Sequence, residues 1–394
     1  MKHLESIFRI TWILLFALFS EHLSAANTDS ITNNMDSVEV ALLTCQPHEE
    51  IYSLYGHTAL RYHDMRTGDD WAFNYGVFNF HAPFFTLRFV FGLTDYELGV
   101  LPTKIFQQEY RYYGSQVTEQ VLNLTAQEKQ AIWQALADNY REENRIYRYN
   151  YFYDNCTSRA RDMVERVISG QIRYQPRPDY SPTYRQMVHD CTQNHPWATW
   201  GNDFLLGIKA DMKTDLRQQE FLPNNLMYDF ARAQIIRQDG SQVPLVKETR
   251  ILVPSGVQVV SQDFPLAPTE CAIILLAISL LIFALEWKKK QTYKWWDILL
   301  MTVQGVMGLV LFAMIFSQHP TVSINLQILL FNPLPFLYIY KVYKGKKTHY
   351  WNLLLCMAVL FLIGSIFQHY AEGLLIVALC LLIRYWSNIR NAKK

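Results

Sequence analysis

A cysteine that directly follows a helix-capping residue is the feature of this sequence that most favours chemistry. Residues 153–159 read YDNCTSR, and apolar residues continue at helical spacing as far as Gly170. If Asn155 caps this helix, Cys156 lies in the first turn, where unpaired N–H groups and the helix dipole stabilise a thiolate. The same donors could bind an oxyanion. Cys156 is therefore predicted to be a nucleophile, and the alternative is a cysteine that only packs behind the cap.

A thiolate nucleophile needs a base, and histidine is the side chain best suited to that task. Residues 35–265 contain six histidines, namely His48, His57, His63, His81, His189 and His195. We prefer His57, because it opens a predicted strand and follows Gly56, which leaves room for a substrate or for the nucleophile. His63 lies near the turn at the end of the same strand and is the weaker candidate.

A Cys–His pair usually has a third polar group that orients the imidazole. The strand predicted next to that of His57 carries Asn74, within residues 73–76 (FNYG), at a height where it could face His57. We name Asn74 as the orienting residue. Asp154 and Asp64 are alternatives, although both have the sequence context of turn residues.

Strands and helices alternate around these residues. Strands are predicted over 38–44, 57–63, 71–77 and 116–124, and the second and third form a hairpin across residues 64–70. One helix is predicted to begin after Thr125, with Glu128 completing a capping box, and another runs from Asn155 to before Gly170. This order of elements indicates an α+β domain over residues 35–265.

The first 26 residues have the features of an export signal. A basic start precedes the apolar residues 10–19, and small residues follow at 24–26. We predict a signal peptide over residues 1–26, and an uncleaved N-terminal anchor is the alternative. Cys45, Cys156 and Cys191 then lie in the exported part, an odd number without the spacing of a metal site, so no metal or other cofactor is expected.

Residues 269–394 have the composition of a membrane domain. Five apolar segments are predicted to be helices, at 271–285, 296–316, 324–340, 351–367 and 373–383. Residues 332–335 (NPLP) could kink the third or make it re-entrant. No ionisable residue is expected well inside a span.

The charges in the loops predict the orientation. Lys and Arg follow the first, third and fifth segments, whereas residues 317–323 and 368–372 carry neither. By the positive-inside rule the basic loops face the cytoplasm, which places the N-terminal domain on the opposite side of the membrane, outside the cytoplasm. The net charge of +1 lacks the basic excess that is typical of nucleic-acid-binding proteins, so nucleic acid is not expected as a partner.

These residues resemble a known family. Residues 53–61 (SLYGHTALR) and 151–159 (YFYDNCTSR) look like the bacterial lipoprotein N-acyltransferase family Lnb. The supporting segments are 42–45 (LLTC), 73–78 (FNYGVF), 181–185 (SPTYR), 196–197 (PW) and 220–223 (EFLP). The order of His before Cys also resembles the circularly permuted papain-like fold of NlpC-type amidases. Residues 201–204 (GNDF) depart from the expected pattern, so the role of that loop is open.

The resemblance implies a two-step reaction. Cys156 attacks an ester carbonyl of a membrane phospholipid, the acyl donor, and forms a thioester. The free amine of a diacylated lipoprotein, the acceptor, then takes the acyl chain as an amide. His57 would be the base and Asn74 its orienting partner. The resemblance says nothing about the oligomeric state.

Two other functions remain open from the sequence. A membrane-anchored cysteine peptidase or amidase acting on cell-wall peptides would use the same pair of residues, although its substrate gives no reason for so large a membrane domain. A scaffold without catalysis is disfavoured by the presence of both Cys156 and His57 in a matching context.

Overall fold

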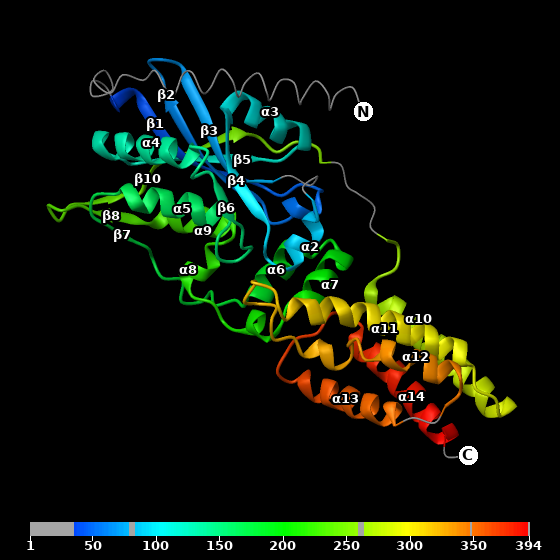
Figure 1. The fold of residues 1–394 in the computed structure, drawn as a ribbon. Coiled ribbons are helices and arrows are strands. Elements are labelled where there is room, and N and C mark those ends of the chain that lie inside the picture. The colour runs from blue at the N-terminus through cyan, green and yellow to red at the C-terminus, as the bar shows by residue number, and fades with distance from the viewer. Residues whose placement is uncertain (1–34, 79–82, 259–263, 347–348, 393–394) are drawn as a thin grey trace, which may run out of the picture.

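The computed structural model describes residues 35–78, 83–258, 264–346 and 349–392. A sheet-rich N-terminal domain is followed by a helical C-terminal region that extends away from it (Figure 1). The predicted signal peptide and His81 lie outside the described residues.

A seven-stranded antiparallel sheet forms the N-terminal domain, in the order β10-β5-β1-β2-β3-β4-β6. Its strands are β1 (Val38–Cys45), β2 (His57–Asp64), β3 (Asp69–Val77), β4 (Asp95–Pro102), β5 (Val117–Leu122), β6 (Ile146–Arg148) and β10 (Val246–Val253). The four predicted strands are confirmed to within two residues at every end, and β2 and β3 form the predicted hairpin. β4, β6 and β10 were not predicted.

Helices cover both faces of this sheet (Figure 1). α4 (Ala126–Tyr140), α5 (Cys156–Val167) and α9 (Pro223–Arg232) pack on one face, in a core that includes Leu42. α3 (Thr103–Tyr113) packs on the other, in a core that includes Leu43. The side chains of neighbouring residues in β1 thus enter opposite cores, as strand geometry requires. The predicted capping box of α4 is confirmed, since the Glu128 N–H donates to Thr125 Oγ1 at 3.3 Å and the Thr125 N–H to Glu128 Oε2 at 2.8 Å.

The remaining elements of this domain are short. β7 (Gln171–Arg173), β8 (Gln234–Ile236) and β9 (Gln242–Pro244) form a second sheet. The helices are α2 (Phe85–Val90), α6 (Tyr184–Thr192), α7 (Pro196–Leu205) and α8 (Leu216–Gln219), with 3-10 turns η2 (Met35–Ser37), η3 (Ile51–Ser53) and η4 (Ile208–Asp211). In Figure 1, α2, α6 and α7 lie where the sheet domain meets the helical region.

The helical region comprises α10 (Pro268–Lys289), α11 (Lys294–Met314), η5 (Leu326–Leu329), α12 (Pro335–Tyr343), α13 (Tyr350–Gly364) and α14 (Leu374–Ala392). Among the described residues, α10, α11 and α14 are long and apolar enough to cross a membrane, and α13 is a shorter apolar helix. The third predicted segment is interrupted between η5 and α12, where Asn332 and Pro333 lie. The number of membrane crossings stays a prediction.

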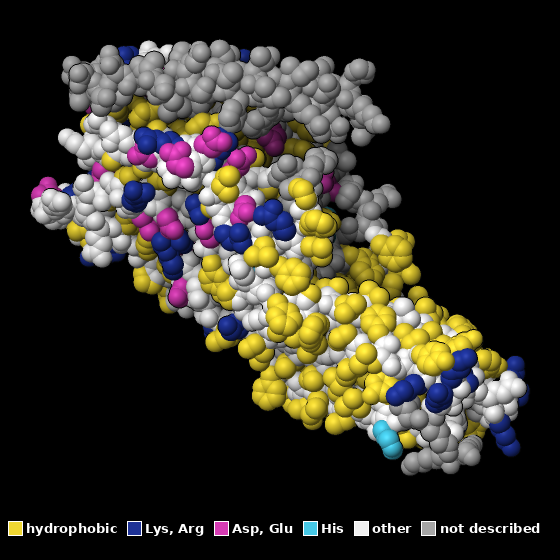
Figure 2. All heavy atoms as spheres, viewed as in Figure 1, with side chains coloured by type: hydrophobic (Ala, Val, Ile, Leu, Met, Phe, Trp, Pro, Cys, Tyr) yellow, Lys and Arg dark blue, Asp and Glu magenta, His cyan; other side chains and the backbone are white. Residues whose placement is uncertain are grey.

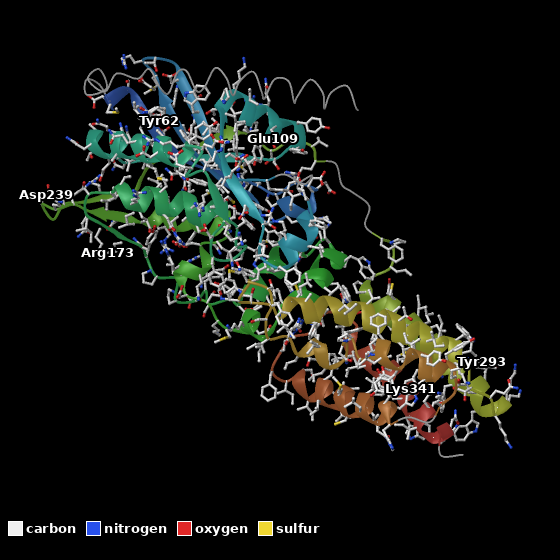
Figure 3. The ribbon with its side chains drawn as sticks, in the orientation of Figure 1. Tyr62, Glu109, Arg173, Asp239, Tyr293 and Lys341 are labelled. Atoms are coloured by element: carbon white, nitrogen blue, oxygen red, sulfur yellow. The ribbon has the colours of Figure 1, made fainter. Side chains whose placement is uncertain are left out.

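The surface of the helical region is apolar along its length and basic at its far end (Figure 2). Tyr293 and Lys341 are labelled near that end (Figure 3). Side chains exposed on this region include Leu281, Val306 and Leu360. Such exposed apolar surface suits lipid rather than water.

One expectation about the membrane segments is wrong. α14 continues past the predicted end of the fifth segment, so Arg384 lies inside the helix and is almost fully buried. Its guanidinium donates to Glu286 of α10, at 2.9 and 3.0 Å, and to Asp297 of α11, at 3.0 Å. Buried charges require such partners. The sequence pattern missed this cluster because its three members come from different helices.

Candidate active site

Cys156 is the first residue of α5, and Asn155 caps the helix. Asn155 Oδ1 accepts hydrogen bonds from the N–H groups of Thr157, at 3.0 Å, and Ser158, at 2.9 Å. The Asn155 amide also donates to the buried Phe221 carbonyl at 2.9 Å, which fixes the cap against the following chain. The predicted position of Cys156 in the first turn is confirmed. Its thiol therefore lies at the positive end of the helix dipole.

His57 begins β2, and its imidazole ring lies beside Cys156. Gly56 has a φ of +74°, which favours glycine, and a Cβ at this position would lie 2.7 Å from the Cys45 carbonyl oxygen. Any other residue at position 56 would push β2 away from β1. Gly56 thus lets His57 start the strand immediately beside Cys156.

Asn74 of β3 lies on the other side of the imidazole ring. Its Oδ1 accepts a short hydrogen bond from His57 Nε2. An amide oxygen can only accept, so Nε2 carries the proton in this bond. Regular pairing of β3 with β4 shifts between Asn74 and Val77, where Gly76 has a φ of +92°. This bulge lies against both Cys156 and His57, and a Cβ on Gly76 would be within 4 Å of each.

Thr157 was not predicted to take part. Its hydroxyl lies 3.8 Å from Cys156 Sγ and 3.1 Å from the hydroxyl of Thr58 in β2. The pair of hydroxyls thus links the start of α5 to the strand that carries His57. A threonine next to a predicted nucleophile has no distinctive spacing, so the sequence offered no signal for this link.

For both Cys156 and His57, the pKa shifts in the direction opposite to the one that burial alone would cause. Burial alone would raise the pKa of the Cys156 thiol, but the positive charge of His57 and its hydrogen bond lower that pKa below its ordinary value. Burial alone would lower the pKa of His57, but the Cys156 thiolate and the hydrogen bonds with Cys156 and Asn74 raise it. The site therefore favours a thiolate–imidazolium pair.

The alternative site residues lie elsewhere. Asp154 is held by Arg159, whose Nε donates to it at 2.6 Å, and Asp64 accepts from the Arg66 N–H in the β2–β3 turn. His48 stacks on Tyr113, with ring centroids 4.0 Å apart, and His63 lies at the far end of β2. Neither aspartate occupies the place that Asn74 has beside His57.

The other two cysteines of this domain are free thiols. Cys45 ends β1 and is buried, and burial raises the pKa of its thiol well above the ordinary value. Burial also raises the pKa of Cys191, in α6, to about 12. Both thiols are protonated at neutral pH, and only Cys156 of the three has a lowered pKa.

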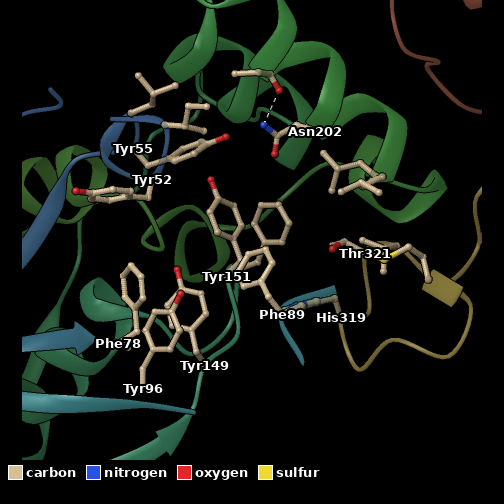
Figure 4. A pocket seen from close by; sticks show the side chains of 18 residues that line it. Tyr52, Tyr55, Phe78, Phe89, Tyr96, Tyr149, Tyr151, Asn202, His319 and Thr321 are labelled. Atoms are coloured by element: carbon tan, nitrogen blue, oxygen red, sulfur yellow. Dashed lines mark hydrogen bonds between the residues drawn. The ribbon is translucent and has the colours of Figure 1, made fainter. Parts of the chain in front are cut away.

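Two adjoining cavities lead away from Cys156. The smaller, of about 130 Å³, is lined by Cys156, His57 and Gly76. The larger, of about 470 Å³, lies between the sheet domain and the loop that follows α11 (Figure 4). Six residues line both cavities, namely Tyr52, Tyr55, Phe78, Tyr96, Tyr149 and Tyr151. The cavity at Cys156 thus opens toward an aromatic passage.

Two family models match the chain. The model of the Lnb N-terminal periplasmic domain matches residues 26–190, and that of the Lnb transmembrane domain matches residues 260–394. The chain belongs to the Lnb family. No curated protein and no solved structure matches it at a significant level.

Membership of the Lnb family fixes the orientation of the molecule. The chain is an inner-membrane protein whose N-terminal domain lies in the periplasm, as the signal and the charged loops predicted. Cys156 and His57 therefore lie in the periplasmic domain. The loop after α11 has its N–H at Gln318 bonded to the Phe91 carbonyl of this domain, so it lies on the periplasmic side.

Residues 201–204, where the sequence departs from the Lnb pattern, lie in the helix α7 and not in a loop, and they have a structural role in this chain. Asp203 of α7 accepts from Arg185 Nη1 at 2.7 Å and lies 2.9 Å from His189 Nε2. His369 completes a group of three side chains whose possible metal-binding atoms lie within 4.8 Å of one another. Because the guanidinium of Arg185 already balances the charge of Asp203, we interpret this group as part of the joint between the domains.

Proposed function

We propose that this chain is a lipoprotein N-acyltransferase that moves an acyl chain from a phospholipid to the N-terminal amine of a diacylated lipoprotein. The observation that carries the proposal is the position of Cys156, at the start of a capped helix, beside His57, whose ring is hydrogen-bonded to Asn74. Its position in the periplasmic domain of an Lnb family member supports a lipid substrate.

In the first step, the Cys156 thiolate attacks the ester carbonyl carbon of the phospholipid. Negative charge then develops on the carbonyl oxygen, close to the N-terminus of α5 and its dipole. The C–S bond forms, the ester C–O bond breaks, and the leaving glycerol oxygen takes the proton of the His57 imidazolium. The products are a lysophospholipid and a thioester on Cys156.

In the second step, the neutral amine of the lipoprotein attacks the thioester carbonyl. The C–N bond forms and the C–S bond breaks, which restores the thiolate, while His57 accepts the proton that the amine loses. An α-amino group has a pKa of about 8, so a useful fraction is neutral in the periplasm. Asn74 holds the ring of His57 so that the same nitrogen serves both steps.

We also infer that the periplasmic domain is a circularly permuted papain-like, NlpC-type domain. The inference is supported by the order of the functional residues, with histidine at the start of β2, its polar partner on β3, and cysteine at the start of α5. Antiparallel β2 and β3 lie side by side under α5, which suits this arrangement.

The test is to trap the intermediate. Purified protein is incubated with phosphatidylethanolamine vesicles, without an acceptor, and its intact mass is measured. We expect one acyl group on the wild type, none on Cys156→Ala, and at least about 100-fold slower acylation for His57→Ala, as for the loss of a general base. A diacylated lipopeptide should then discharge the thioester. An unacylated wild type, together with altered muropeptides in a strain that lacks the gene, would instead indicate a cell-wall peptidase.

A further inference from the structure

The larger cavity has the size and the chemistry of a binding site for a fatty acyl chain. Its volume of about 470 Å³ is within the range of about 300–1,000 Å³ that small-molecule sites have. None of the 18 described residues that line it is a lysine, arginine, aspartate or glutamate. Burial lowers the pKa of His319, its one histidine, which is therefore neutral at neutral pH.

The walls of this cavity come from both domains. Tyr96 and Tyr149 of the sheet domain form one side, with rings stacked 4.1 Å apart, and Ala198 of α7 forms another. Met314 and Val322, at the periplasmic end of α11 and in the loop after it, complete the enclosure. Neither domain could make this cavity alone.

Exposed apolar side chains lie next to the cavity on the side that faces the membrane domain. The side chains of Phe84, Leu87 and Phe89, at and in α2, are 76%, 56% and 40% exposed. α2 is held against the membrane domain, since the carbonyl of Phe89 lies 3.3 Å from His319 Nε2. Phe89 and His319 both line the cavity (Figure 4), so the exposed face of α2 continues into it. Exposed apolar side chains beside a membrane are suited to contact with lipid.

We propose that this inter-domain cavity binds the acyl chain of the donor lipid and limits its length, with the ester carbonyl at Cys156. The inference rests on the proposed transfer from a phospholipid. The chain runs from Cys156 through the passage of shared tyrosines and ends against Ala198 and Val322. Each methylene buried there strengthens binding about fourfold, so loss of the far part of the cavity weakens the binding of long chains selectively.

The first test shortens the cavity. Ala198 lines the larger cavity and not the smaller one at Cys156, so Ala198→Phe puts a bulky side chain into the part away from the thiol, and Ala126→Phe places the same side chain at an exposed position of α4 as a matched control. Acylation of Cys156 is measured by intact mass with dipalmitoyl and with dioctanoyl phosphatidylethanolamine in the same detergent. For Ala198→Phe we expect the palmitoyl rate to fall at least about tenfold relative to the octanoyl rate, because two lost methylenes already correspond to that factor.

The two rates separate the possible failures. Octanoyl transfer by Ala198→Phe reports that the variant is folded and that the catalytic residues are intact. If the wild type accepts neither lipid, the proposed function itself fails. If Ala198→Phe keeps the palmitoyl to octanoyl ratio of the wild type and of Ala126→Phe, the function stands and the assignment of the cavity is overturned.

A second test uses the wild-type protein and does not depend on the folding of a variant. A phosphatidylethanolamine whose acyl chain carries a diazirine at its end is allowed to acylate Cys156 and is then irradiated. We expect crosslinked peptides that contain α7 or residues 314–322. Crosslinks confined to other parts of the periplasmic domain would overturn the proposal.

Discussion

At the scale of single residues, the reactivity of Cys156 depends on two opposing effects. Burial alone would raise the pKa of its thiol, and the imidazolium of His57 lowers it. Cys45 shows what burial does without such a partner, since its pKa lies well above the ordinary value. The thiolate at position 156 is therefore a property of the pair and not of the helix N-terminus alone.

This balance predicts the pH dependence of alkylation. In the wild type, the rate of Cys156 modification by iodoacetamide should reach half its maximum below about pH 8.5, the ordinary pKa of a thiol. In His57→Ala only burial and the weaker hydrogen bonds remain, so the pKa rises and the midpoint moves above that value. At pH 7 the rate should fall at least about tenfold, because each unit of pKa removes about nine-tenths of the thiolate.

Cys156→Ser supplies the background from the other five cysteines in the same experiment. The contribution of Cys191 to that background should be small, because its pKa of about 12 keeps it protonated. An identical profile for the wild type and for His57→Ala would contradict the coupling of the two side chains.

At the scale of elements, the cap of α5 both stabilises the helix and holds Cys156 in position. Asn155→Ala removes the acceptor for two N–H groups, at a cost of about 1 kcal/mol, and leaves the buried Phe221 carbonyl without its donor, at a further 1 kcal/mol or so. We expect a lower Tm in detergent and at least about tenfold slower acylation of Cys156, since misplacement by even 1 Å costs that much.

Thr125→Ala is the matched control for this prediction. Thr125 caps α4 with the same type of capping box, so its loss should also cost about 1 kcal/mol and lower the Tm. α4 carries none of the proposed site residues, and its cap lies away from both cavities. Acylation should therefore keep the wild-type rate. Equal loss of acylation in both variants would mean that the cap of α5 acts through stability alone.

The same elements show how far sequence reasoning reached. Caps and strand alternation are local, so α4, α5 and the β2–β3 hairpin could be predicted from neighbouring residues. His57 and Cys156 are about a hundred residues apart in the sequence. Their proximity was predicted because a thiolate nucleophile needs a base, and the family resemblance supported it. The bulge at Gly76 and the bond between Thr58 and Thr157 follow from how β3, β4 and α5 meet, and no local pattern encodes that.

The region after Gly170 shows the limit most clearly. No chemical role could be assigned to this region from its sequence, yet its helix α7 joins the two domains. The last carbonyls of a helix have no partner within it. Here, side chains of the membrane domain supply the donors. Asn325 donates to the Phe204 carbonyl at 2.8 Å, Gln327 to that of Asp203 at 2.8 Å, and Gln368 to that of Leu206 at 3.2 Å. These pairs lie more than a hundred residues apart, beyond any periodicity.

At the scale of the whole molecule, the joint between the domains should matter for lipid substrates more than for the thiol itself. Cys156, His57 and Asn74 all belong to the sheet domain, whereas the larger cavity needs walls from both domains. A change that loosens the joint should therefore separate the two properties. Small-molecule alkylation should survive, and transfer from phospholipid should not.

Arg185 is the residue with which to test this separation. It is buried, and its guanidinium holds Asp203 and Asp211 at 2.7 Å each. Arg185→Leu leaves two carboxylates without their cation, which costs about 3–5 kcal/mol for a buried pair and should loosen α7. We expect phospholipid acylation to fall at least about tenfold, while the pH midpoint of Cys156 alkylation stays that of the wild type.

Arg141→Leu is the control, because Arg141 pairs with Asp138 on the surface, where both side chains are mostly exposed and the pair contributes at most about 1 kcal/mol. It should leave both readouts unchanged. If Arg185→Leu instead moved the pH midpoint of Cys156 alkylation as far as His57→Ala does, the coupling of Cys156 to His57 would depend on the joint between the domains. If it left lipid acylation intact, the membrane domain would serve only as an anchor, since the placement of its loops against α7 would then make no difference to the transfer.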